Sequence, residues 1–284
     1  WPDGSVKWAL CDLRANVPAN GSASNIFIQE GDGDSGQADI ISNGGSTWDI
    51  DTGIMEARIK KTDFNIVDYV EVNGEVLVQP GTSPGIVGQL TSGDVLSPDS
   101  STSVTIEENG PARAVILAEG TLATDAGQKV IDFTCRITAR AGNSDLEVTF
   151  TVRNANIQRP QHTVVEGIEL WIKTRTGSNP VARISRHDGM QTLPLGNNDN
   201  AWIHQAYSAA DTTDLSGSPS SSYKPHIPYS GSNTLADEGY RIVTNDGTVF
   251  STGNEDLYPQ HGFGNLAGDS GGVTVAIRQM PYFW

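Results

Sequence analysis

The side chains best suited to chemistry gather after residue 177, where the chain is rich in Asp, Asn, Ser, Gly and Pro. Histidine and tyrosine in loops above a β scaffold suit proton transfer and sugar stacking. The histidine spacing fits no zinc site, because no pair lies at i and i+4 with a Glu partner. Each histidine alone is more often an ordinary loop residue, so only the group as a whole indicates a site. The candidates are Arg186, His187, Trp202, His204, Tyr207, Tyr258 and His261.

A second motif, Gly-Asp-Ser-Gly-Gly at residues 268–272, matches the nucleophile loop of chymotrypsin-like proteases. Such a protease needs its His and Asp on an upstream barrel, and no segment of that kind is present. The motif also precedes only one expected strand, which is too little to complete a second barrel. We therefore expect a glycine-rich β-turn here.

Residues 30–39 form an acidic, glycine-rich stretch whose spaced carboxylates could hold Ca²⁺. The stretch lacks the ligand order and the final bidentate Glu of a calcium-binding hand, so a flexible connector is the alternative that we favour. We expect no other cofactor and no metal site.

Composition limits the partners. The 284 residues include 34 acidic and 18 basic side chains, giving a formal net charge of −16. This charge disfavours nucleic acid and anionic membrane surfaces, and no run approaches the roughly 18 apolar residues of a membrane span. Cys11 and Cys135 both lie in expected strands, and two buried thiols or one disulfide fit equally well.

The fold class follows from residues 110–156, where three runs rich in β-branched residues are separated by turn residues. In the third run Leu146, Val148, Phe150 and Val152 alternate with polar side chains, which predicts one buried face. We therefore predict an antiparallel meander within an all-β protein, a large antiparallel β-sandwich with long loops.

Other strands are predicted more locally. Asn73-Gly74 between two apolar runs predicts a hairpin. Residues 81–93 are expected to form a loop, and few strands are expected over 177–239. No convincing amphipathic helix longer than about two turns is present. The remaining expected strands are 5–13, 25–29, 54–60, 66–72, 75–78, 104–107, 164–175, 240–244, 249–251 and 273–278.

Two segments together resemble a known family. Residues 1–8, Trp-Pro-Asp-Gly-Ser-Val-Lys-Trp, resemble the end of the RIFT-like barrel in the exo-rhamnogalacturonan lyase and YetA-like family. The meander that begins Gly110-Pro111-Ala112-Arg113-Ala114 resembles that family's following sandwich, which is of the galactose-mutarotase-like, supersandwich kind. The resemblance implies the end of a barrel-like domain at 1–38 and a sandwich domain at 39–284. It also implies that the chain is a processed product or a piece of a longer protein.

The resemblance implies action on acidic polysaccharide by β-elimination, in which a base removes the proton α to a uronate carboxylate and a cation neutralises that carboxylate. On this basis His204 or Tyr207 is expected near the base, Arg186 as the neutralising cation and Trp202 as a sugar platform. His187, Tyr258 and His261 are expected to contact substrate. The family's active cleft is expected to involve an α/α toroid after the sandwich, so catalysis by this chain alone stays open.

The alternative is a non-enzymatic role, as a carbohydrate-binding module or a structural subunit of an extracellular or viral assembly with homo-oligomer contacts. An acidic, loop-rich, all-β chain suits either function. Both hypotheses predict carbohydrate or assembly partners, and an extracellular, secreted or virion-associated location.

Overall fold

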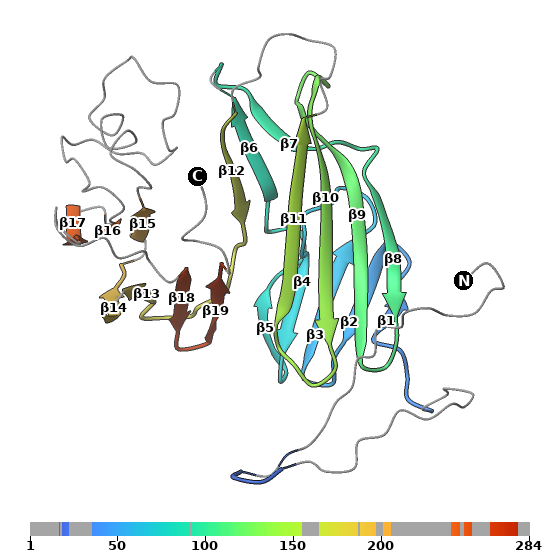
Figure 1. The fold of residues 1–284 in the computed structure, drawn as a ribbon, viewed down its shortest axis with the longest axis horizontal. Coiled ribbons are helices and arrows are strands. Elements are labelled where there is room, and N and C mark those ends of the chain that lie inside the picture. The colour runs from blue at the N-terminus through green and yellow to red at the C-terminus, as the bar shows by residue number, and fades with distance from the viewer. Residues whose placement is uncertain are drawn as a thin grey trace.

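Every regular element that the structure describes is a β-strand (Figure 1). The computed structural model describes residues 17, 19–22, 36–90, 92–154, 165–186, 188–196, 201–205, 240–244, 247–251 and 262–277. All strand pairs in these ranges are antiparallel, which confirms the predicted fold class. None of them contains a helix long and apolar enough to cross a membrane.

One layer of the sandwich is a five-stranded sheet whose strands follow each other in chain order. The predicted hairpin at Asn73-Gly74 is confirmed: both residues have positive φ, 52° and 83°, as a two-residue turn of this kind requires. The strands are β1 (Ile41–Asn43), β2 (Thr47–Asp51), β3 (Met55–Lys60), β4 (Tyr69–Val72) and β5 (Glu75–Val78).

The other layer is a seven-stranded sheet that contains the predicted meander. Its strands are β6 (Gly85–Leu90), β7 (Val95–Pro98), β8 (Ser103–Asn109), β9 (Arg113–Thr124), β10 (Lys129–Arg140), β11 (Leu146–Asn154) and β12 (Val165–Trp171). The order is β11-β10-β9-β7-β6-β12, and β8 also pairs with β9. Strand β9 is long enough to pair with β8 over its first half and with β7 at its end.

The core lies between these two layers, which Figure 1 shows face to face. Strand β10 contributes alternate buried residues to it, including Phe133 and Ile137. The Phe133 ring stacks on Phe64, from the loop between β3 and β4, at 6.1 Å and on Phe150 of β11 at 5.4 Å. Cys135 lies in the same row as a free thiol, and burial raises its pKa to about 12.

Residues 177–239 contain more strands than the sequence predicts. Two further sheets have the orders β14-β13-β18-β19 and β15-β16-β17. Each of these strands is only five or six residues long, so their pairing partners specify them more than local propensity does. The strands are β13 (Val181–Arg186), β14 (Gly189–Pro194), β15 (Ala201–Gln205), β16 (Tyr240–Thr244), β17 (Gly247–Ser251), β18 (Phe263–Gly268) and β19 (Gly271–Ala276).

The predicted loop at 81–93 is wrong, because strand β6 occupies residues 85–90 of it. Its glycines gave the segment a turn-like composition, but Gly85 is needed for packing. A Cβ at Gly85 would lie 2.5 Å from the Cα of Asn65, so the two backbones touch. The strand predicted over 66–72 is confirmed only from Tyr69 onward, as β4, since Ile66 has a φ of 67°.

Residues 173–178, which we call the connecting segment, join the sandwich to the sheet β14-β13-β18-β19, which we call the third sheet. On the sandwich side, Thr174 forms an isolated bridge with Val78, and the Arg175 N–H donates to the Leu77 carbonyl at 2.7 Å. On the other side, the Ser270 N–H donates to the Thr176 carbonyl at 3.0 Å. Asp269 and Ser270 form the turn between β18 and β19, so the glycine-rich turn predicted there is confirmed.

Candidate functional site

Strand β15 carries two of the predicted site residues, Trp202 and His204. Its register with β16 places Val243 opposite Trp202 and Arg241 opposite His204. The backbone therefore brings an arginine position beside the predicted base, which the sequence spacing did not suggest. Of the remaining candidates, His187, Tyr207, Tyr258 and His261 lie outside the described residues.

Arg186, the predicted neutralising cation, ends strand β13. Its Nε and Nη2 donate to the two carboxylate oxygens of Asp188 at 2.8 and 2.7 Å. Its Nη1 also lies 3.5 Å from the Gln191 side-chain oxygen. A bidentate partner uses the geometry with which a guanidinium binds a carboxylate, so Arg186 would have to leave Asp188 to bind a uronate.

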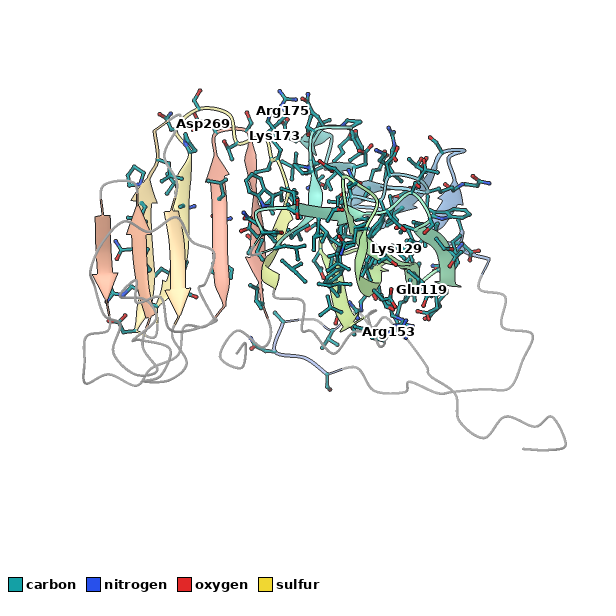
Figure 2. The ribbon with its side chains drawn as sticks, turned by 90° about the horizontal axis from the view of Figure 1, so that it is seen from above. Glu119, Lys129, Arg153, Lys173, Arg175 and Asp269 are labelled. Atoms are coloured by element: carbon teal, nitrogen blue, oxygen red, sulfur yellow. The ribbon has the colours of Figure 1, made fainter. Side chains whose placement is uncertain are left out.

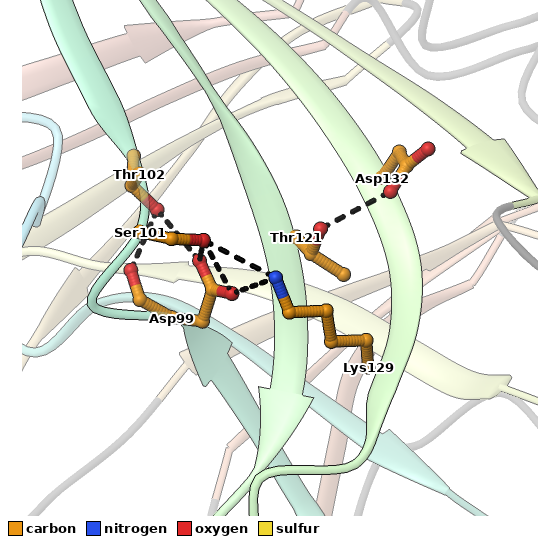
Figure 3. Close-up of polar contacts among 6 residues, drawn as sticks. All are labelled: Asp99, Ser101, Thr102, Thr121, Lys129 and Asp132. Carbon is orange, nitrogen blue, oxygen red and sulfur yellow. Dashed lines mark hydrogen bonds and ion pairs between the residues drawn. The ribbon is translucent and has the colours of Figure 1, made fainter.

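The outer face of β8 to β11 is polar, but its cations are paired. Arg136 makes a bidentate contact with Glu107 at 2.7 and 2.8 Å, and Arg153 contacts Asp132 at 3.0 Å. Lys129 lies 2.8 Å from Asp99, and Figure 3 shows this pair beside the hydrogen bond from Thr121 to Asp132. Because these charges are already neutralised, this face is a weak candidate for binding an anion.

The same pairs shift the pKa values of their carboxyl groups. The hydrogen bond from Arg136 is the main cause that lowers the pKa of Glu107. Burial alone would raise the pKa of Asp99, but the hydrogen bonds from Lys129 and Ser101 outweigh it and hold the pKa below its ordinary value. Both shifts indicate carboxylates held in structural contacts.

A different surface lies on β12 and the start of the connecting segment. Leu170 pairs with Ile86, a core residue, so Trp171 faces the opposite, outer side. The alternation continues past the strand: Ile172 packs on the core, whereas Lys173 and Arg175 are exposed. We call Trp171, Lys173 and Arg175 the Trp171 stripe.

Trp171 is 53% exposed, more than any other large apolar side chain in the described residues. Its indole Nε1 donates to the Glu169 carboxylate, two residues earlier on the same face. An exposed indole held in this way offers a flat apolar surface with a polar edge. Such a surface can stack on the C–H face of a sugar ring.

Lys173 and Arg175 supply the charge. Within the described residues neither side chain forms an ion pair. Figure 2 shows both at one edge of the molecule, on the side away from Glu119, Lys129 and Arg153. In an extended chain, residues two apart lie about 6.6 Å apart, so both cations can meet one charged sugar or two neighbouring ones. The described residues hold no cluster of three or more His, Cys, Asp or Glu that could bind a metal.

The comparison with known proteins identifies the family. A model of the PcRGLX-like protein central beta sandwich domain matches residues 40–192, more than half of the chain. The chain belongs to the PcRGLX-like family. The match runs from the start of β1 into β14 and so contains both sandwich layers and the Trp171 stripe. A search of curated proteins finds no match to the chain.

Membership of the PcRGLX-like family confirms the predicted relation to rhamnogalacturonan lyases at the level of the family. The predicted domain boundary at residue 38 and the predicted site residues stay predictions. The Trp171 stripe is not predicted from the sequence, although Glu169, Trp171 and Lys173 alternate onto one face of an expected strand. What was not visible is that Trp171, Lys173 and Arg175 all stay exposed in the part of the chain that the structure describes.

Proposed function

We propose that this chain binds acidic polysaccharide through the Trp171 stripe, as the sandwich part of a polysaccharide-lyase-like protein. The observation that carries the proposal is an exposed indole followed by two cations without ion-pair partners among the described residues, on a protein of net charge −16. Family membership supports the same class of ligand.

The aromatic ring and the two cations of this extended segment make different kinds of contact with a polysaccharide. The indole of Trp171 binds a sugar ring by dispersion and C–H contacts, which depend little on charge. Lys173 and Arg175 attract uronate carboxylates, and Arg can bind a carboxylate bidentately. The acidic remainder of the surface repels polyanions, so a charged ligand is favoured where cations without ion-pair partners in the described part of the chain gather, as at this stripe.

For degradation, the proposal retains His204 or Tyr207 as the base that removes the proton α to the carboxylate. The electron pair left on that carbon expels the 4-linked sugar and forms the unsaturated product. The neutralising cation is Arg186 or, by its register opposite His204, Arg241. Arg241 is favoured because Asp188 already engages Arg186.

The test uses a panel of uronate-containing and neutral polysaccharides. Binding is measured by affinity electrophoresis, and elimination by the ultraviolet absorbance of the unsaturated product. Retardation by acidic members only, with product formed, supports binding and catalysis. Retardation without product supports the binding-module alternative for this chain. Equal behaviour with acidic and neutral members, or no binding to either, would overturn the proposal.

A further inference from the structure

We propose that Asn65, Asp68 and Ser83 are positioning residues for the Trp171 stripe, an inference that rests on the proposed function. The three side chains are only 5%, 8% and 7% exposed, and they form a buried polar cluster beside the apolar core. They lie under the outer surface at the point where β12 ends and the connecting segment begins.

Ser83 makes the direct contact with the stripe. Strand β12 ends at Trp171, so the amide of Lys173 lies beyond the strand ladder. This amide donates to the Ser83 Oγ at 3.0 Å. The hydroxyl takes the place of a ladder acceptor and keeps the chain extended past the strand end. Lys173 therefore stays on the same side as Trp171.

Asn65 and Asp68 fix the backbone around Ser83 through hydrogen bonds. The Asn65 Nδ2 donates to the Ser83 carbonyl at 3.3 Å and to the Asp68 Oδ1 at 3.1 Å. The Gly81 N–H donates to the same Asp68 oxygen at 2.9 Å. The Asp68 carboxylate and the Asn65 amide thus hold the two ends of the short segment 81–83. They thereby fix the position of the Ser83 hydroxyl.

The backbone around Asn65 is strained in a way that fits this role. Ile66 is β-branched, yet its φ is 67°, and the Val67 N–H donates to the Asn65 carbonyl at 2.8 Å. A turn of this type around a left-handed bulky residue is rare. Strained backbone persists only where surrounding contacts determine it, and it clusters at functional sites. The strain places the Asn65 side chain towards Ser83.

The other end of the stripe contacts the same cluster through backbone. Trp171 pairs with Gly85, which has a φ of 81° and lies against Asn65. A Cβ at Gly85 would lie 2.7 Å from the Asn65 carbonyl oxygen. Asn65 is therefore next to the strand partner of Trp171 and, through Ser83, next to the amide of Lys173. It sets the position of the aromatic and the charged part of the stripe together.

The test is a double-mutant cycle with an oligogalacturonate as the probe, measured by titration calorimetry on the full chain. Ser83→Ala should lower the affinity about tenfold, and Lys173→Ala should lower it by a similar factor. If Ser83 acts through Lys173, then Ser83→Ala in the Lys173→Ala background should add little. Independent, multiplying losses would overturn the proposal. Ser83→Thr keeps the hydroxyl and should restore most of the affinity.

A second readout needs no ligand. Amide hydrogen exchange in a peptide covering residues 171–175 should accelerate in Ser83→Ala and stay slow in Ser83→Thr, and unchanged exchange in Ser83→Ala would overturn the proposal. Ser185→Ala is the matched control, because Ser185 is equally buried in the third sheet. It should lower stability without changing either readout. A wild-type chain that does not bind the probe would contradict the proposed function, while the exchange experiment would still decide the positioning role.

Discussion

Trp171 donates its indole N–H to the carboxylate of Glu169, and both side chains lie on the outer face of the same edge strand. The contact fixes the ring against rotation while leaving 53% of the residue exposed. Holding an aromatic ring in place before a ligand arrives reduces the entropy lost on binding. This arrangement is expected of a binding surface.

Replacing Trp171 should weaken polysaccharide binding with little effect on folding. Aromatic contacts contribute about 0.5–1.5 kcal/mol beyond buried area, so Trp171→Ala should lower the affinity about 3–10-fold. Because the side chain is half exposed, the free energy of unfolding should change by about 0.5 kcal/mol or less. Calorimetry and denaturant unfolding measure the two quantities. Trp171→Phe should retain most of the affinity, and Met190→Ala, at another exposed apolar residue, should retain all of it.

Lys173 and Arg175 should determine how binding depends on salt. Contacts between cations and a polyanion weaken as ionic strength rises, since salt screens exposed charges. The double variant Lys173→Gln/Arg175→Gln should bind more weakly at low salt and lose less affinity as salt is added. The double variant Arg136→Gln/Arg153→Gln is the charge-matched control, because both arginines are exposed but contact Glu107 and Asp132. An identical salt dependence in the Lys173→Gln/Arg175→Gln variant and the wild type would exclude both cations from the site.

Asp99 should contribute to stability only above its own pKa. Burial raises the pKa of Asp99, but the hydrogen bonds from Lys129 and Ser101 lower it by more than burial raises it. The pKa of Asp99 in the folded chain therefore lies below its pKa in the unfolded chain. The contribution is therefore present above the ordinary Asp pKa and is lost as pH falls through the folded pKa. Asp99→Asn should cost about 1 kcal/mol at neutral pH. In urea unfolding, the difference from the wild type should be complete above the ordinary Asp pKa and should shrink as pH falls below it; a constant difference would contradict the cause given for the shift.

The meander was predictable from the sequence because strand alternation in Leu146–Asn154 and the turn residues around it agree with the final packing. Strand β6 was not, because Gly85 lies where two backbones meet, and glycine in a sequence signals a turn more often than a close approach. Arg186 was selected by type, but its partner Asp188 is visible only in the fold. The Trp171 stripe depends on which strand face is exposed in the folded part that the structure describes, and local sequence does not encode that.

Cys135 should be unreactive in the folded chain and should destabilise it at high pH. Burial raises the pKa of this thiol from 9.0 to about 12. Its contribution to stability is complete below the unfolded pKa and is lost as pH rises from about 9 to about 12. In a Cys11→Ser chain, a thiol reagent should label Cys135 only after unfolding. Rapid labelling of the folded chain at mildly alkaline pH would show that the thiol is accessible.

Gly85 should tolerate no side chain. Its φ of 81° disfavours any L-residue, and an added Cβ would meet Asn65 backbone atoms at 2.5 Å. Gly85→Ala should lower the free energy of unfolding by about 3 kcal/mol or more, from the left-handed conformation and the backbone overlap together. Gly127→Ala is the control, since Gly127 has a φ of 80° and open space around its Cα. Equal losses in thermal unfolding would mean that the contact with Asn65 contributes nothing.

The most direct test of the central claim is hydroxyl-radical footprinting of Trp171 with and without saturating oligogalacturonate. In the free chain the exposed indole should oxidise readily, and bound ligand should protect it several-fold. Trp48, whose indole donates to the Val104 carbonyl between the two layers, serves as the internal reference and should not change. Protection of Trp171 alone is the result predicted here. An unchanged oxidation rate at Trp171, under conditions where binding is complete, would contradict the claim that the Trp171 stripe holds the polysaccharide.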